Sequence, residues 1–362
     1  MFNNNDKSLI WLNSFSNLTY HKKKLLFDMY QDNLSNLFEN FLKDKQKILS
    51  IIDDKTYETM AYANTDSFIN THIKSLQNSG IKVVTILNAE YPDKLKNIDS
   101  PPFVLYCKGD VSLLKATCFA IVGTRRVTNY GRTVTEKFTK DLCQNGFCIV
   151  SGLSSGVDTV AHETTLLSKG KTIAVLAGGL DYIYPPTNFN LSNDIVKNGG
   201  LLISECKPSQ KAEPYYFPIR NRIIAGLSCG VLITEADEKS GSMHTKNYAL
   251  DNNIDVYSVP GNITNKLSLG CNRIIANGQA KAVLDITDIL DDYNIKYQPK
   301  QQTLFSLTKD EQLILDVLGE EELAFIEILT KTKLETKTLN TLLTTMAIRG
   351  IIKKLAGNMY SK

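Results

Sequence analysis

Arginine is rare in this chain, and its positions mark places where phosphate recognition is expected. The sequence has seven arginines against 34 lysines, and six of the seven lie between Arg125 and Arg273. A chain that uses lysine for most of its positive charge should keep arginine for sites that need a planar, bidentate donor, as phosphate groups do. The alternative is that these arginines form ordinary surface ion pairs.

The first candidate site is the segment Val122-Gly-Thr-Arg-Arg126, which follows an apolar run and opens a predicted helix. Gly123 would let the backbone approach a ligand, and the free N–H groups of the helix start, Thr124 among them, would attract an anion. Arg125 and Arg126 would add charged donors. The Gly-x-Gly-x-x-Gly pattern of dinucleotide-binding loops is absent. The alternative is an ordinary strand-to-helix turn with surface arginines.

The second candidate site begins at Ser151 and Gly152 and continues to Asp158, with His162 one helical turn further on. Glycines and serine hydroxyls at the end of a strand make a plausible phosphate nest. Asp158 and His162 could bond each other. We expect this pair to fix the start of a helix rather than to catalyse a reaction, because no nucleophile accompanies it.

The third candidate site is Phe217-Pro-Ile-Arg-Asn-Arg222. Arg220 and Arg222 could clamp phosphates beside Asn221, and an exposed Phe217 could stack on a base. In the alternative interpretation, Phe217 belongs to the core and both arginines form ion pairs.

The fourth candidate site lies before another predicted helix, where Ser240, Gly241 and Ser242 offer small donors. No Walker A motif, Gly-x-Ser-x-Gly elbow or His-Glu-x-x-His helix occurs, so we expect no catalytic residues, no metal and no cofactor. The pattern favours a site that holds phosphates without reacting with them. The predicted nucleic-acid-binding residues are Gly123, Thr124, Arg125, Arg126, Ser151, Gly152, Phe217, Arg220, Asn221, Arg222, Ser240, Gly241 and Ser242.

These loops must be positioned by strands, and the sequence predicts a doubly wound, mostly parallel α/β sheet. Short apolar, β-branched runs alternate with amphipathic helices from residue 116 to about 291, and parallel strands covered on both faces show this pattern. The loops that follow such strands meet at one edge. The predicted strands are 81–86, 103–106, 119–122, 147–150, 172–176, 201–203, 231–234, 255–259 and 282–284.

The length of 362 residues suits several domains. We predict an N-terminal helical domain over 1–80, a Rossmann-like DNA-binding domain over 81–290, a polar linker over 291–303 and a winged-helix-like domain over 304–362. In the last of these, Thr308 should cap the first helix. Its third helix carries little positive charge, so we expect a protein-interaction or dimer-supporting role there rather than DNA reading.

Composition places few limits on partners. The net charge is only +3, so any basic surface must be local. The seven scattered cysteines show no Cys-x-x-Cys pair and fit a reducing cytoplasm. No signal peptide and no apolar run long enough to span a membrane are recognised, so we expect a cytoplasmic protein that does not use a membrane.

In order and spacing, these motifs resemble the DprA/Smf family of DNA-processing proteins. Besides the segments above, the resemblance rests on Ala-Gly-Gly-Leu-Asp181, Ser204-Glu205 and Val-Pro-Gly261, and it covers about residues 80 to 290. It implies a dimeric protein that binds single-stranded DNA and helps to load RecA recombinase during natural transformation. It also implies that Arg125, Phe217, Arg220, Asn221 and Arg222 line the DNA pocket.

The competing interpretation is an enzyme. Rossmann-like phosphoribohydrolases of the lysine-decarboxylase-like family also gather glycine, threonine and glutamate loops at one sheet edge, and they cleave nucleotide monophosphates. Glu235 and the nearby Ser-Gly-Ser loop could act in that way. Their Pro-Gly-Gly-x-Gly-Thr-x-x-Glu signature is missing here, which favours the DNA-binding interpretation.

Overall fold

The computed structural model describes residues 2–31, 33–296, 307–319, 321–355 and 357–362. It divides into two compact units, Met1–Gln298 and Pro299–Lys362, which are described separately. Most of the predicted linker 291–303 lies outside the described residues; its described part begins with a 3-10 turn at Asp291–Tyr293.

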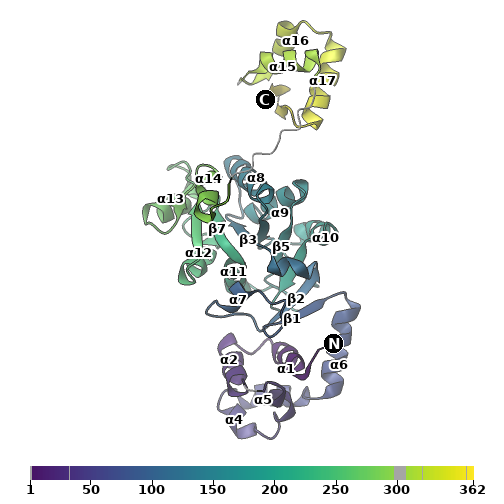
Figure 1. Cartoon of the computed structure of the whole chain (residues 1–362), viewed down its shortest axis with the longest axis vertical. Coiled ribbons are helices and arrows are strands. Elements are labelled where there is room, and N and C mark those ends of the chain that lie inside the picture. The colour runs from purple at the N-terminus through teal and green to yellow at the C-terminus, as the bar shows by residue number, and fades with distance from the viewer. Residues whose placement is uncertain (1, 32, 297–306, 320, 356) are drawn as a thin grey trace. The chain divides into compact units, whose positions relative to one another are not determined.

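The first unit is built on a sheet with the strand order β1-β2-β6-β5-β4-β3-β7-β8-β9. Five of these strands, β1, β2, β5, β3 and β7, are labelled in Figure 1. The strands β3 to β9 pair in parallel, whereas β1 and β2 pair antiparallel with each other, and β2 pairs antiparallel with β6. The predicted doubly wound, mostly parallel sheet is thereby confirmed. The strands are β1 Lys82–Thr85, β2 Val104–Gly109, β3 Cys118–Val122, β4 Cys148–Ser151, β5 Thr172–Val175, β6 Leu201–Ser204, β7 Ser228–Ile233, β8 Asp255–Ser258 and β9 Lys281–Ala282.

Helices cover both faces of this sheet. Successive residues of a strand point to opposite faces, so strands that are apolar throughout need burial on both. On β3, Phe119 and Ile121 join one buried cluster, whereas Ala120 and Val122 join another. The helix α8 packs against α9, and α11 packs against α12. The helices that follow the strands are α7 Asp93–Lys96, α8 Asn129–Gln144, α9 Val157–Leu167, α10 Phe189–Lys197, α11 Tyr216–Leu227, α12 Ser242–Asp251, α13 Lys266–Ala276 and α14 Thr287–Leu290.

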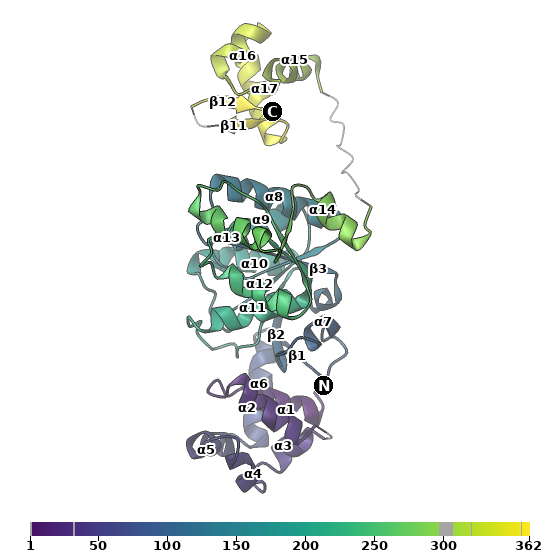
Figure 2. The ribbon, with the colours of Figure 1, turned by 90° about the vertical axis from the view of Figure 1, so that its left-hand side faces the viewer.

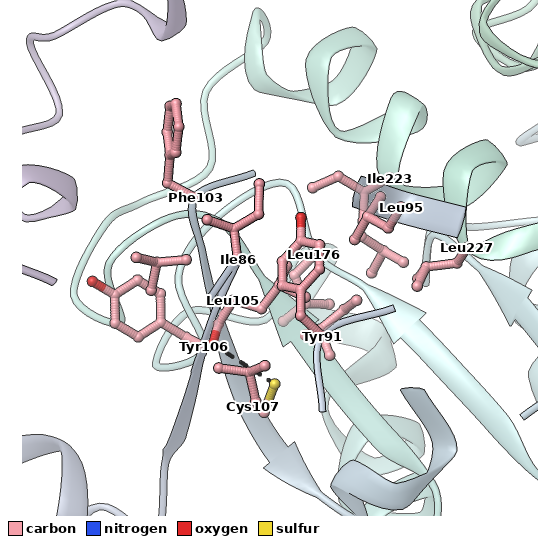
Figure 3. Packing of buried hydrophobic residues seen from close by; sticks show 14 of the residues in the cluster. Ile86, Tyr91, Leu95, Phe103, Leu105, Tyr106, Cys107, Leu176, Ile223 and Leu227 are labelled. Carbon is pink, nitrogen blue, oxygen red and sulfur yellow. Dashed lines mark hydrogen bonds between the residues drawn. The ribbon is translucent and has the colours of Figure 1, made fainter. Parts of the chain in front are cut away.

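The N-terminal helices share a buried cluster with the sheet. Trp11 lies at their centre, with the edges of Phe15, Phe38 and Phe41 against it at centroid distances of 4.9 to 5.4 Å. The cluster continues through β2 to α11, where Leu95 packs near Ile223 (Figure 3). Residues 1–80 and 81–290 therefore fold as parts of one compact unit. These helices are α1 Asn4–Asn13, α2 Tyr20–Met29, α3 Ser35–Glu39, α4 Lys45–Leu49, α5 Asp54–Tyr62 and α6 Asp66–Asn78.

The second unit has three helices and a small antiparallel sheet (Figure 2). Thr308 caps the first helix, because its hydroxyl accepts a hydrogen bond from the Glu311 N–H. The Glu311 carboxylate in turn accepts from the Thr308 N–H. The predicted cap is therefore confirmed. The unit has its own core, which includes Ile314, Leu339 and Tyr360. The order of three helices followed by a two-stranded hairpin is the one that the sequence predicted for this unit. Its elements are α15 Lys309–Leu318, β10 Leu323–Ala324, α16 Phe325–Thr332, α17 Thr336–Ile348, β11 Lys353–Leu355 and β12 Met359–Ser361.

No helix within the described ranges combines the length and the apolar character that crossing a bilayer requires.

Candidate functional site

A cavity of about 580 Å³ opens at the carboxyl ends of β3 and β7. Consecutive strands run outward from β3 on one side as far as β6, and the chain then crosses to β7 on the other side of β3. Open α/β sheets bind ligands at such a reversal of strand order. Ten of the thirteen predicted site residues line this cavity: Gly123, Thr124, Arg125, Arg126, Phe217, Arg220, Asn221, Ser240, Gly241 and Ser242.

The loop after β3 displays Arg125 and Arg126 because Glu235, just past the end of β7, holds the loop in place. The backbone N–H of Thr124 donates to the Glu235 carbonyl at 2.7 Å. The Glu235 carboxylate accepts from the N–H and the hydroxyl of Thr128 at 2.8 and 2.6 Å. A Cβ at Gly123 would fall 2.7 Å from the Glu235 carbonyl oxygen, so only glycine allows this approach. Arg125 and Arg126 themselves are exposed.

These bonds also bear on the enzyme interpretation, which relied on Glu235 as the reacting acid. Glu235 is only 1% exposed, and each of its carboxylate oxygens already accepts a hydrogen bond from Thr128. The residue is a buried brace for the start of α8, where a carboxylate is also favoured by the helix dipole.

An aromatic wall, formed by Tyr184 and Phe217, stands beside Arg125. The guanidinium carbon of Arg125 lies 5.1 Å from the centre of the Phe217 ring. Tyr184 meets the same ring nearly edge-on, with centroids 5.5 Å apart and planes at 73°. Phe217 is half-buried at the cavity, so it is neither a core residue nor fully exposed. Sequence reasoning did not select Tyr184; its only signal was the Tyr-Pro step after Asp181.

Arg220 is buried, which corrects the expectation of an exposed phosphate clamp. Its guanidinium donates to the Gly152 carbonyl at 2.6 Å and to the Val175 carbonyl, and its Nε donates to Asn221. Burial lowers the pKa of Arg220 to about 10, although nearby Asp158 opposes the shift. The side chain therefore ties α11 to the ends of β4 and β5, with one surface left at the cavity.

Arg222 does not line the cavity, so the prediction that it is an exposed phosphate ligand is wrong. It is 5% exposed, and its Nη2 donates to both carboxylate oxygens of Glu205 at 2.8 and 2.7 Å. Its guanidinium carbon lies 5.8 Å from the centre of the Tyr20 ring on α2. Two residues beyond Arg220, a helix has turned about 200°, so the side chain points towards the N-terminal helices instead.

Ser151 and Gly152 are also absent from the cavity lining. The Ser151 hydroxyl donates to the Ile121 carbonyl inside the sheet. A Cβ at Gly152 would fall 2.5 Å from an Arg220 guanidinium nitrogen, so this glycine makes room for the arginine rather than for a ligand. The same loop reaches the cavity further on, at Ser154 and Asp158.

Asp158 and His162 do not form the pair that their spacing allowed. Asp158 accepts from the Ser154 N–H at 3.2 Å, which holds the loop before α9. The Nδ1 of His162 bonds the Thr172 hydroxyl at 2.7 Å, and burial lowers the pKa of His162 to about 3. The histidine is therefore a neutral core residue, and the interpretation that these residues fix local structure fits their positions.

The loop before α12 closes the far side of the cavity. The hydroxyls of Ser240 and Ser242 lie 2.8 Å apart, and Asn221 donates to the Gly241 carbonyl at 3.0 Å. Lys239 and His244 from the same segment also line the cavity. Three exposed cations, Arg125, Arg126 and Lys239, line the cavity. The buried Arg220 and the carboxylates of Asp158 and Asp237 line it as well. In the described part of the chain, no group of three or more histidine, cysteine, aspartate or glutamate side chains is placed to hold a metal ion.

Comparison with known proteins gives consistent matches. The family model of the DNA recombination-mediator protein A matches residues 82–294, more than half of the chain. The DNA processing protein DprA of Bacillus subtilis is 41% identical over 229 residues, which cover 62% of this chain and 76% of that protein. The DprA of Streptococcus pneumoniae is 42% identical over 209 residues, covering 58% and 73%.

Two solved structures are similar as well. The crystal structure of DprA from Streptococcus pneumoniae superposes with a TM-score of 0.69 at 32% identity, covering 82% of this chain and 99% of that one. A structure of DprA from Helicobacter pylori, which concerns the binding of single-stranded DNA by that protein, gives a TM-score of 0.54 at 33% identity and covers 60% and 98%.

Proposed function

Because the chain belongs to the DNA recombination-mediator protein A family, we propose that its cavity binds single-stranded DNA in DNA processing during natural transformation. The observation that carries the proposal is the braced loop after β3, which presents Arg125 and Arg126 beside an aromatic wall. Guanidinium groups bind phosphates, and aromatic rings stack on bases of any kind, so this combination suits a strand of any sequence.

The proposed contacts fall into two groups. Arg125, Arg126 and Lys239 would bind backbone phosphates, with the small donors Thr124, Ser240 and Ser242 around them. Arg220 and Asn221 would position α11 and so the wall, as their bonds to Gly152 and Gly241 indicate. Three of the predicted ligands would instead support the structure around the site, because they do not line the cavity: Arg222, Ser151 and Gly152.

The partners follow from the family. We propose that the protein acts as a homodimer and passes its strand to RecA recombinase, with the winged-helix-like unit in a protein-interaction or dimer-supporting role. The natural compartment would be the cytoplasm, which suits the seven free thiols. We also propose that no chemical step occurs at the cavity. Assaying base release from adenosine monophosphate tests this, because release at enzymatic rates would restore the phosphoribohydrolase interpretation.

A salt series tests the binding itself. Affinity for single-stranded oligonucleotides should fall as salt rises, because bound cations release counterions from the strand. The three exposed cations at the cavity, Arg125, Arg126 and Lys239, give an expected slope of log affinity against log salt of about −2, at roughly −0.7 for each phosphate neutralised. Fluorescence anisotropy with single strands and with a blunt duplex of the same sequence measures this. Equal affinity for the two forms would contradict the proposal.

Removal of residues 301–362 should preserve the binding of single-stranded DNA at the cavity. The first unit contains the whole cavity lining and ends at Gln298, and the second unit has its own core. A fragment of residues 1–300 should therefore fold, as circular dichroism would show, and bind single strands within about threefold of the full chain, or roughly 0.7 kcal/mol. A folded fragment that no longer binds would place the site elsewhere.

A further inference from the structure

The guanidinium group of Arg125 packs on the aromatic ring of Phe217. We propose that Phe217 is a positioning residue for Arg125, so that the two side chains bind one backbone phosphate as a unit. The proposal rests on the proposed function and deepens it. It is separate from any stacking of Phe217 on a base, because it requires the ring to contribute even where the strand carries no base.

Arg125 needs such support. It is exposed, it is followed directly by Arg126, and it lies near enough to the buried Arg220 to lower the pKa of that guanidinium. Both neighbouring guanidinium groups therefore repel that of Arg125. Across the described residues no ion pair joins Arg125 to a carboxylate, and its observed contact is the Phe217 face at 5.1 Å. An arginine without a support would spread over many rotamers, and binding would have to order it.

A ring is a suitable support because it leaves the charge available. A carboxylate that held Arg125 would neutralise it and occupy its N–H donors. An aromatic face attracts the cation through its quadrupole and lies against the guanidinium. The N–H groups point outward in the guanidinium plane, so they stay free for the bidentate contact that phosphate favours. The arrangement thus orders the arginine without using its donors.

The ring itself is fixed. Phe217 lies in the first turn of α11, which Arg220 fastens to the Gly152 carbonyl. The centre of the Tyr184 ring lies 5.5 Å from that of Phe217, with the two planes at 73°. These contacts restrict the ring, and the Arg125 guanidinium carbon lies 5.1 Å from its centre. The sequence placed the two residues in separate candidate sites, whereas the geometry couples them.

The experiment is a double-mutant cycle on two ligands. One ligand is a short oligothymidylate, and the other is an abasic oligonucleotide of the same length, which offers a backbone without bases. The variants are Phe217→Leu, Arg125→Ala, the double variant and Phe217→Tyr, with Phe68→Leu on α6 as the matched control far from the cavity. Affinity is measured over a salt series, and melting temperature is recorded for each variant.

We expect Phe217→Leu to weaken abasic-strand binding about threefold to tenfold, or roughly 0.7–1.4 kcal/mol, and to reduce the salt slope by about 0.7, the value of one lost phosphate contact. In the Arg125→Ala background the same change should cost nothing further on the abasic strand, because coupled residues are not additive. Phe217→Tyr, which keeps the ring face, should bind as the wild type does. Phe68→Leu should have no effect.

Three results would overturn the proposal. They are wild-type abasic binding in Phe217→Leu, an unchanged salt slope, or losses that add fully in a double variant whose melting temperature shows that it is folded. If the wild-type protein binds neither ligand, the proposed function fails instead, so the two failures are distinguishable.

Discussion

Replacing Glu205 by glutamine is expected to lower the free energy of unfolding by about 3 kcal/mol, because it leaves buried positive charge without its partner. Glu205 accepts two bonds from Arg222, whose side chain is 6% exposed. One Arg222 nitrogen already lacks a partner among the described residues. The Glu205 side chain is 22% exposed, so the expected loss lies at the low end of the range for buried pairs.

A second cation depends on the same carboxylate. Lys23 donates to Asn13 at 2.9 Å, and burial lowers the pKa of Lys23 while Glu205 opposes that shift. Asn13 in turn donates to the Glu205 carbonyl at 2.9 Å. These contacts join the N-terminal helices α1 and α2 to the end of β6 and to α11. Loss of the Glu205 carboxylate therefore removes a favourable interaction with Arg222 on α11 and another with Lys23 on α2.

Thermal and urea unfolding of Glu205→Gln measure the effect. The matched control is Glu136→Gln, which breaks the exposed 3.6 Å pair with Arg132 and should cost less than about 0.5 kcal/mol. The double variant Glu205→Gln with Arg222→Met removes both charges and should regain part of the loss. If Glu205→Gln is as stable as its control, the junction does not depend on this pair.

Replacing Arg125 by lysine is expected to weaken single-strand binding about tenfold or more while leaving stability unchanged. Lysine keeps the charge but offers no planar fork, and a lost charge-assisted contact costs roughly 1.5–3 kcal/mol. Arg125 is exposed, so the melting temperature should change by no more than about 1 °C. Anisotropy titration and thermal melting on the same preparation separate the two effects.

Arg222→Lys provides the contrast. The sequence predicted a phosphate contact at Arg222, and for such a contact this change would weaken binding and leave stability unchanged. The structure reverses both expectations, because Arg222 is buried against Glu205 and does not line the cavity. Its melting temperature should fall while the folded protein keeps its affinity. Arg132→Lys, at an exposed position on α8, should change neither property. Wild-type affinity in Arg125→Lys would show that the fork is not needed.

The sequence by itself determined the fold and the place of the site. Apolar runs of three to six residues separated by helices indicate a parallel sheet with both faces covered, because helices on both sides bury such strands. All nine strands predicted for the sheet are found, with ends that differ by at most three residues. The loops that follow parallel strands must meet at one edge, and the cavity lies there. The Thr308 cap was equally visible, since a cap is a local bond between near neighbours.

Only the tertiary structure decided what each arginine does. Arg125 and Arg222 both lie in short motifs with a second arginine nearby. Nothing in either motif indicates that Arg125 is exposed to solvent and that Arg222 pairs with Glu205. The partner of Arg222 lies 17 residues away in the sequence, and the N-terminal helices that cover it lie about 200 residues away. The antiparallel pairing of β2 with β6 was hidden for the same reason. The burial of a side chain depends on which distant segments of the chain pack against it. The residues of a short motif do not specify those segments.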